Sequence, residues 1–298
     1  MKLIKASFNI IEQGPSIDGI YKIIEQAGRV CYKSEDKITE DSAKEFVERM
    51  IKSGHGAMLE HGTVYLFLTM SSRQQYFKYC SNPYSVANST GEAEKGTWNG
   101  FVTTNYRVLV ENGWLEDLEY ICNPGKEHEK RITVRFVCDR GVSHEFVRHR
   151  VFSFAQESTR YCNYSKDKFG NELTFIIPRW LSLSNGSYTY DYPNGFTKDG
   201  SKWDSKLELN TFLLSLVRSE ATYLELIEQG WAPQQARAVL PNSLKTELVM
   251  TGFVSDWKRF FRLRSRIAKT GKPHPQAQEL ADPLMDEFVK RGIMETLL

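Results

Sequence analysis

The stretch that governs the fold is residues 131–161, RITVRFVCDRGVSHEFVRHRVFSFAQESTRY. Apolar residues alternate with polar ones in its first part and share one face of an expected strand: Ile132, Val134, Phe136 and Cys138. Such alternation is typical of a strand with one buried face. A helical pattern follows from about Gly141 to Phe152. The stretch therefore predicts a strand and then a helix, leading into a segment dense in arginine.

The rest of the chain repeats this mixture of strands and helices. Expected strands cover residues 2–10, 63–68, 174–177 and 247–254, and expected helices cover residues 16–28, 41–53, 207–229, 255–266 and 276–296. Strands so dispersed among helices exclude a helix bundle and a β-sandwich. We therefore predict an α+β fold, a mixed α/β single domain over residues 1–298 with a mainly antiparallel central sheet flanked by helices.

Composition narrows the class of protein. The chain has 298 residues, 41% of them hydrophobic, a mean hydropathy of −0.45 and a formal net charge of +2. No run approaches the ~20 apolar residues of a membrane span, and the start, MKLIKAS, lacks the apolar core of a secretory signal. The five cysteines are scattered without a CxxC pair, so neither a metal site nor a disulfide framework is indicated. We expect a cytoplasmic protein that binds no metal and no membrane.

Residues 148–161 carry the chemistry. Their charges are almost all arginine, interrupted by hydroxyl and amide groups at Ser153, Gln156 and Ser158. Arginine grips phosphate with two parallel hydrogen bonds, and serine and backbone N–H groups complete such a cradle. A solvated helix end followed by loop charges would also fit this composition.

These residues also match a family signature, R-H-R-x-x-S-x-x-x-x-S-x-R, at every fixed position: Arg148, His149, Arg150, Ser153, Ser158 and Arg160. The signature is that of the flavin-dependent thymidylate synthases, the ThyX family, which this chain resembles. Further segments resemble the family in the same order: residues 55–61 (HGAMLEH), 139–147 (DRGVSHEFV), 235–241 (QARAVLP), 255–264 (SDWKRFFRLR) and 274–279 (HPQAQE). Ordered matches over so much of the chain favour the family over coincidence.

The resemblance implies an enzyme, a methyltransferase that converts dUMP to dTMP. It implies FAD as cofactor, 5,10-methylenetetrahydrofolate as carbon donor, NADPH as reductant, hydride delivery through the flavin, and active sites between subunits of a homotetramer. Methylation of uracil C5 needs a hydride, which side chains cannot supply, so a redox cofactor agrees with the chemistry. The resemblance also implies that no enzyme cysteine forms an adduct with the base, which agrees with a sequence in which no cysteine stands in an evident basic, nucleophile-like setting.

The resemblance also assigns roles to residues of this chain. Arg264 is the expected catalytic residue, because it would stabilise negative charge on the uracil ring. The expected cofactor-binding residues are His55, Ala57, Arg148, His149, Arg150, Gln156, Ser255 and Arg259. The expected substrate-binding residues are Glu145, Arg148, Gln156, Glu157, Ser158, Thr159, Arg160, Arg237 and Arg264. Without the resemblance, an ordinary turn histidine is a more frequent explanation of His55 than a ligand-binding role.

Some features depart from the family pattern. Residues 69–130 and 182–205 are expected to be insertions, because many relatives have far less chain between the matched segments. Individual positions also differ from those of some relatives: Ala57, Glu145, Ala155 and Arg259. These departures bear on single contacts and not on the class of protein.

Two other functions compete with this interpretation. A non-enzymatic nucleic-acid-binding protein could use the arginine clusters together with aromatic residues that stack on bases. The small net charge and the lack of a known nucleic-acid-binding motif argue against it, so we predict no nucleic acid partner. A scaffold that binds flavin but no longer methylates is the second alternative, against which Arg264 and the intact signature argue.

Overall fold

The computed structural model describes residues 1–192, 194–202, 207–269 and 271–297, without the side chains of residues 207–210. Its centre is a four-stranded sheet in the order β2 (Ser7–Ile11), β6 (Arg131–Asp139), β12 (Lys245–Phe253) and β7 (Ser153–Gln156). Every neighbouring pair in this sheet is antiparallel. The predicted fold, a mixed α/β chain around a mainly antiparallel sheet, is confirmed.

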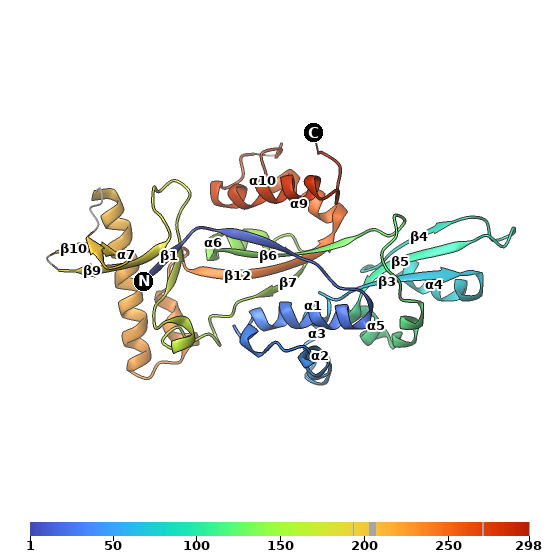
Figure 1. The fold of residues 1–298 in the computed structure, drawn as a ribbon, viewed down its shortest axis with the longest axis horizontal. Coiled ribbons are helices and arrows are strands. Elements are labelled where there is room, and N and C mark those ends of the chain that lie inside the picture. The colour runs from blue at the N-terminus through green and yellow to red at the C-terminus, as the bar shows by residue number, and fades with distance from the viewer. Residues whose placement is uncertain (193, 203–206, 270, 298) are drawn as a thin grey trace.

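Helices cover both faces of the central sheet (Figure 1). On one side lie α9 (Val254–Arg264), α10 (Pro275–Lys290) and α6 (Arg140–Phe146), and on the other lie α1 (Ser16–Val30), α2 (Ser42–Lys52) and α3 (Gly56–Leu59). Val134, Phe136 and Cys138 point from β6 into an apolar core with Trp257 and Phe260 of α9. Burial of each such side chain stabilises the fold by roughly 1.5–3 kcal/mol.

The opposite face of β6 is polar. Thr133 and Arg135 alternate with the core residues, and the same face of β12 carries Glu247 and Thr251. Because α1 covers this face, its polar groups are removed from water and need partners within the protein. The face of β6 opposite the apolar core therefore forms a polar layer between the central sheet and α1.

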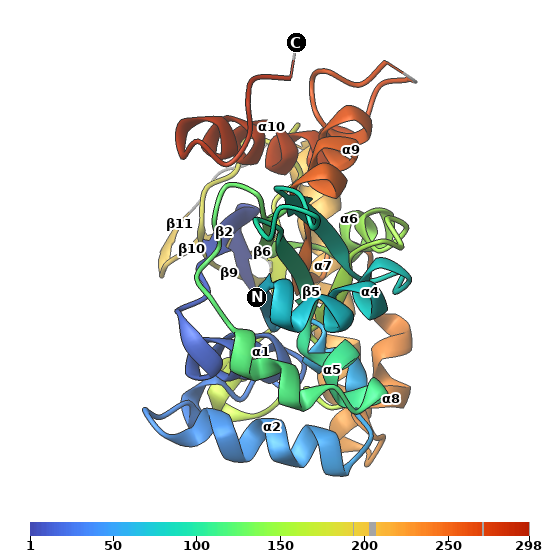
Figure 2. The same ribbon diagram turned by 90° about the vertical axis from the view of Figure 1, so that its right-hand side faces the viewer.

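A second, three-stranded sheet forms a lobe beside the central sheet, in the order β3 (Thr63–Thr69), β5 (Asn99–Asn105) and β4 (Val86–Thr90) (Figure 2). The other elements of the lobe are η2 (Met70–Ser72), α4 (Arg73–Cys80), α5 (Tyr106–Asn112) and η3 (Leu115–Tyr120). This sheet packs against α1 and α2 through one apolar cluster, in which Val64 and Leu66 meet Ile20 and Phe46. Residues 69–130, the first expected insertion, thus lie mostly in this lobe.

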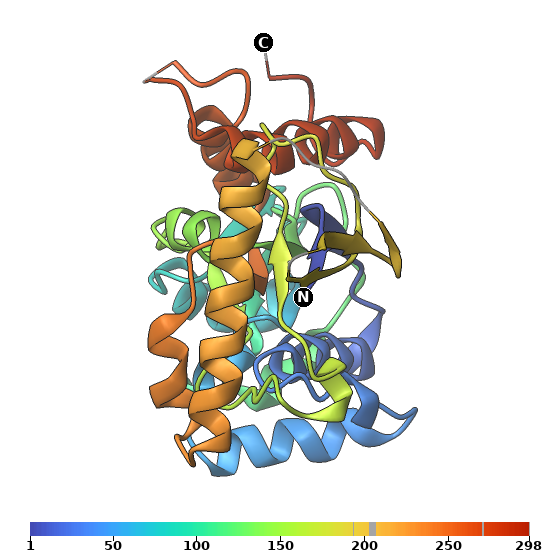
Figure 3. The ribbon, with the colours of Figure 1, turned by 90° about the vertical axis from the view of Figure 1, so that its left-hand side faces the viewer.

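A third sheet lies at the other end, in the order β11 (Ser201–Lys202), β10 (Gly195–Lys198), β9 (Gly186–Asp191), β1 (Lys2–Ile4) and β8 (Thr174–Ile176). The β1–β8 pair is parallel. The long helix α7 (Leu207–Glu228) stands at this end (Figure 3) and is followed by α8 (Pro233–Ala236) and η5 (Arg237–Val239). The short helices η1 (Glu35–Lys37) and η4 (Asp167–Phe169) complete the described elements.

The second expected insertion, residues 182–205, contributes β9, β10 and β11 to this sheet, although residues 193 and 203–205 lie outside the described residues. Whether either segment is an insertion stays a prediction. Within the described ranges, no helix combines the length and apolar character needed to cross a membrane.

Candidate active site

The central part of the site is where the end of α6 meets the end of α9. Asp139 caps α6 by accepting a hydrogen bond from the Val142 N–H at 2.8 Å, which is how a helix start is stabilised. The chain leaves α6 at Phe146 and runs directly into Arg148, His149 and Arg150 of the signature. The order of strand, capped helix and signature follows that predicted from the sequence.

Arg264, the last residue of α9, reaches back to these residues. Its Nε donates to Nε2 of His149 at 3.1 Å, and its Nη1 contacts the Glu145 carboxylate at 2.5 Å. Its Nη2 donates to the Glu145 carbonyl oxygen at 3.0 Å. The structure therefore brings three of the predicted residues together and engages all three guanidinium nitrogens of Arg264.

His149 is neutral in this setting. Burial, together with the positive charges of Arg264 and Arg148, lowers the pKa of His149 to about 4. Its ring packs on Phe260, with the ring centres 5.1 Å apart. Burial also lowers the pKa of Arg264, which Glu145 partly restores, and the guanidinium remains charged. The site thus holds a cation against an uncharged imidazole.

The end of β7 supplies Gln156. Its Nε2 donates to Ser143 Oγ at 2.9 Å and to Thr246 Oγ1 at 3.2 Å. Both bonds use the amide nitrogen, and Oε1 has no protein donor among the described residues. Gln156 can therefore present an acceptor to a ligand.

The next residue, Glu157, points inward and is only 2% exposed. Its carboxylate accepts from the Tyr164 hydroxyl at 3.1 Å and pairs with Lys245 at 2.7 Å. In this structure Glu157 thus anchors the loop of residues 156–160, whereas the sequence predicts substrate contact. A substrate role for this carboxylate needs these two bonds to be replaced.

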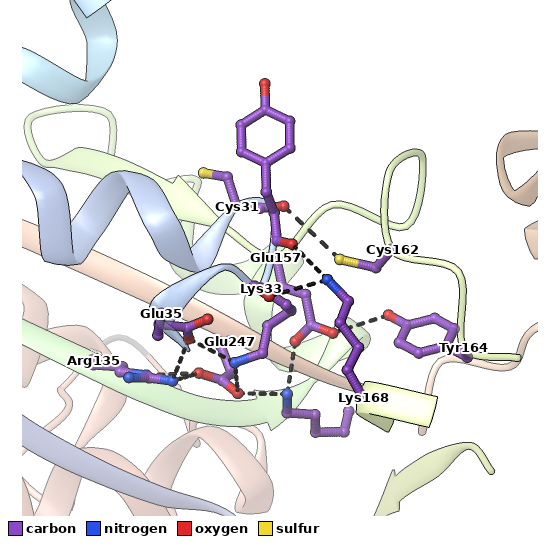
Figure 4. A network of polar contacts seen from close by, with 11 residues as sticks. Cys31, Lys33, Glu35, Arg135, Glu157, Cys162, Tyr164, Lys168 and Glu247 are labelled. Carbon is purple, nitrogen blue, oxygen red and sulfur yellow. Dashed lines mark hydrogen bonds and ion pairs between the residues drawn. The ribbon is translucent and has the colours of Figure 1, made fainter. Parts of the chain in front are cut away.

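Behind the loop lies a set of buried and half-buried polar side chains that we call the Glu247 network (Figure 4): Lys33, Glu35, Arg135, Glu157, Tyr164, Lys245 and Glu247. Glu247 Oε1 contacts Lys33 at 2.9 Å and Lys245 at 2.5 Å, and its Oε2 contacts Arg135 Nε at 2.6 Å. Sequence reasoning missed this network. The available signal in the sequence was a charged residue, Glu247, at the start of the otherwise apolar segment ELVM, residues 247–250.

The far end of the loop forms a second group of predicted residues. Arg237 Nη1 donates to Thr159 Oγ1 at 3.1 Å, and both residues border a cavity of about 240 Å³ that Arg140 also lines. Ser158 Oγ accepts from the backbone N–H of Arg160, whose guanidinium lies over the Tyr161 ring at 5.2 Å. No contact joins Arg237 or Arg160 to Arg264 within the described part of this single chain.

Four other predicted residues lie apart from both groups and are exposed: His55, Ala57, Ser255 and Arg259. His55 and Ala57 belong to the turn and short helix α3. The Ser255 N–H donates to Glu129 at 2.9 Å, and Arg259 lies 3.9 Å from Asp256 at the start of α9. A cavity of about 620 Å³, which Gln13, Tyr65 and Cys122 line, contains none of the predicted site residues.

A buried arginine and a buried histidine connect the lobe to the central sheet. Arg131 donates to the Glu60 carbonyl at 3.0 Å and to Ser153 Oγ at 3.2 Å. His61, which is fully buried, contacts Thr251 Oγ1 through Nδ1 at 2.8 Å, while its Nε2 has no hydrogen-bond partner among the residues that the structure describes. Burial and the nearby charge of Arg131 lower the pKa of His61 to about 3.

The depressed pKa of His61 predicts a loss of stability in mild acid. The unfolded chain takes up a proton near pH 6.5, whereas the folded chain excludes it until about pH 3. The free energy of unfolding should therefore fall as pH drops below 6.5, by about 2 kcal/mol from this group at about pH 5. Urea unfolding of the wild type and of His61→Asn at several pH values measures this. Equal pH dependence in both proteins would contradict the assignment to His61.

Comparisons with known proteins place the chain in a family. Residues 127–291 match the family described as thymidylate synthase complementing protein (Thy1). The chain is 27% identical over 205 residues to the flavin-dependent thymidylate synthase of Pyrococcus furiosus, covering 67% of this chain and 73% of that one. It is 24% identical over 254 residues to the enzyme of that name from Mycobacterium avium, covering 83% and 68% of the two chains.

A solved structure is also similar: the UMP/dUMP methylase PolB from Streptomyces cacaoi bound with 5-Br dUMP, at 18% identity and a TM-score of 0.44, covering 97% of this chain and 93% of that one. The family match spans more than half of this chain. The chain belongs to the Thy1 family. The family predicted from the sequence is confirmed, and with it the prediction of an enzyme.

Proposed function

We propose that this protein is a flavin-dependent thymidylate synthase that methylates dUMP to dTMP. In this proposal FAD is the cofactor, 5,10-methylenetetrahydrofolate the carbon donor and NADPH the reductant. The observation that carries it is the arrangement of arginines, in which Arg264 is held between Glu145 and His149 beside the exposed arginines of the signature. Membership of the family and the names of its relatives support the same activity.

The residues present fit the phosphate groups of FAD and dUMP. Four arginines of the predicted site are exposed, and none of them pairs with a carboxylate among the described residues: Arg148, Arg150, Arg160 and Arg237. Exposed guanidinium groups without a counter-ion are suited to bind phosphate. We infer that His149, Arg150, Ser255 and the exposed residues His55 and Ala57 face the flavin, while Arg148 and Gln156 contribute to both ligands. Bound FAD would supply the redox chemistry that side chains lack.

The remaining residues would bind and orient dUMP. Arg160, Arg237 and the hydroxyls of Ser158 and Thr159 would hold the nucleotide, with Gln156 Oε1 as an acceptor for the base. Arg264 would stabilise negative charge that develops on the pyrimidine. His149 stays neutral near pH 7, so it accepts the hydrogen bond from Arg264 without adding a competing charge.

Within one chain the arginines of the predicted site form two separate groups, Arg264 with Arg148 and Arg237 with Arg160. In the proposed homotetramer, residues of neighbouring subunits would complete each group. Exposed apolar residues close to the signature, Val151 at 60% and Leu263 at 46%, are suited to such contacts. Light scattering of the purified protein tests the tetramer directly.

The activity is tested with purified protein and the three reactants dUMP, methylenetetrahydrofolate and NADPH. We expect a yellow protein whose NADPH oxidation responds to dUMP and which forms dTMP only when methylenetetrahydrofolate is present. A yellow protein that forms no dTMP would support the flavin-binding scaffold instead. A colourless protein that binds oligonucleotides with a steep salt dependence would support the nucleic-acid-binding alternative.

A further inference from the structure

Glu145 differs from the other charged groups around the signature because it neutralises an arginine of the site. Arg264 forms its ion pair with Glu145 at 2.5 Å, whereas Arg148, Arg150, Arg160 and Arg237 have no carboxylate partner among the described residues. The side chains of Arg264 and Glu145 are only 17% and 29% exposed. Partial burial makes such a charge interaction stronger than at an open surface.

The carboxylate of Glu145 is not needed to hold Arg264 in place. Without it, Nε would still donate to His149 at 3.1 Å and Nη2 to the backbone carbonyl of Glu145 at 3.0 Å. Those two bonds fix the plane of the guanidinium group. The carboxylate therefore adds mainly a negative charge at the position where Nη1 would otherwise meet a ligand.

We propose that Glu145 is an internal counter-ion that cancels the positive charge of Arg264 and so lowers the affinity of the site for an anionic, phosphate-bearing nucleotide. The inference rests on the proposed function, because it takes dUMP as the ligand. With Glu145 in place, the site presents one net positive charge fewer to an incoming nucleotide, whichever of its groups Arg264 meets. This difference in charge weakens the binding of an anion more than that of an uncharged nucleoside.

The substitution Glu145→Gln tests this, because glutamine keeps the size of the side chain and an oxygen that can accept from Nη1. We expect FAD-loaded Glu145→Gln protein to bind dUMP about tenfold more tightly than the wild type does in isothermal titration calorimetry. Binding of 2′-deoxyuridine, which lacks the phosphate, should change less than about threefold. A purely structural role for Glu145 would weaken both ligands together.

The matched control is Asp286→Asn, which removes the carboxylate partner of Arg266 on the exposed side of α10. It should leave the affinity for dUMP unchanged. If Glu145→Gln does not retain flavin, Glu145→Ala is measured in the same way. Equal or weaker dUMP binding by the Glu145 variant would overturn the inference while leaving the proposed function intact. A wild-type protein that binds no dUMP would overturn the proposed function and the inference with it.

Discussion

Replacing Arg264 with glutamine is expected to lower the turnover rate of dTMP formation by about 10²–10³-fold, the usual effect of removing one group that stabilises charge in a transition state. Among the arginines of the predicted site, Arg264 makes the most hydrogen bonds, to His149 and to two oxygens of Glu145. Glutamine keeps some hydrogen bonding but no charge. Turnover is measured at saturating dUMP, so that loss of substrate affinity does not hide the effect.

Two further variants test whether the loss of turnover depends on the charge and the position of Arg264. Arg264→Lys keeps the charge but cannot make three directed bonds, so its rate should lie between those of the wild type and Arg264→Gln. Arg266→Gln removes an arginine two residues away that is bound to Asp286 on the outside of the protein, and it should keep the wild-type rate. Equal losses in Arg264→Gln and Arg266→Gln, or none in Arg264→Gln, would contradict the catalytic role.

The fold was predictable from the sequence because its central strands have one strongly apolar face. The alternation in residues 131–138 predicts β6, and β6 observed at Arg131–Asp139 lies within the central sheet. Strand β12 and helix α9, which follows it, were likewise expected. The short strands β4, β10 and β11 were not, because they are largely polar segments without an apolar face to mark them as strands.

The site was predictable to a smaller extent, and for a physical reason. The signature residues are adjacent in the chain, so their proximity follows from sequence alone. The assignment of Glu145, His149 and Arg264 to the site came only through the family resemblance, and their mutual contacts were not predicted. The Glu247 network joins side chains up to 214 residues apart, from Lys33 to Glu247. A charged residue in an apolar strand signals that a partner exists, but it does not identify the partner.

Replacing Glu247 with glutamine is expected to lower the free energy of unfolding by about 3 kcal/mol near pH 7. Burial alone would raise the pKa of this carboxyl, but Lys245 and Lys33 outweigh it and lower the pKa to about 2 from its ordinary 4.5. The side chain is almost fully buried, at 7% exposure, so solvent does little to screen the interaction. Chemical denaturation of the two proteins measures the difference.

The pH dependence of this difference separates the charge from other effects of the substitution. The folded pKa is depressed, so the stabilisation is present above about pH 4.5 and is lost as pH falls toward 2. The wild type and Glu247→Gln should therefore converge in acid. Glu287→Gln, which removes a partly exposed carboxylate bound to Arg291 at 2.7 Å, is the matched control and should leave stability nearly unchanged.

Loss of the Glu247 carboxylate should also affect the loop of residues 156–160. Lys245 bridges the carboxylates of Glu247 and Glu157, and the Glu157 N–H donates to the Glu247 carbonyl at 2.9 Å. Because Gln substitution leaves that backbone bond in place, the loop should stay attached but be held less firmly by its buried carboxylate. A raised KM for dUMP with a nearly unchanged kcat is therefore expected in Glu247→Gln. The opposite split, a fall in kcat alone, would place Glu247 in the chemical step, which its burial away from the exposed arginines argues against.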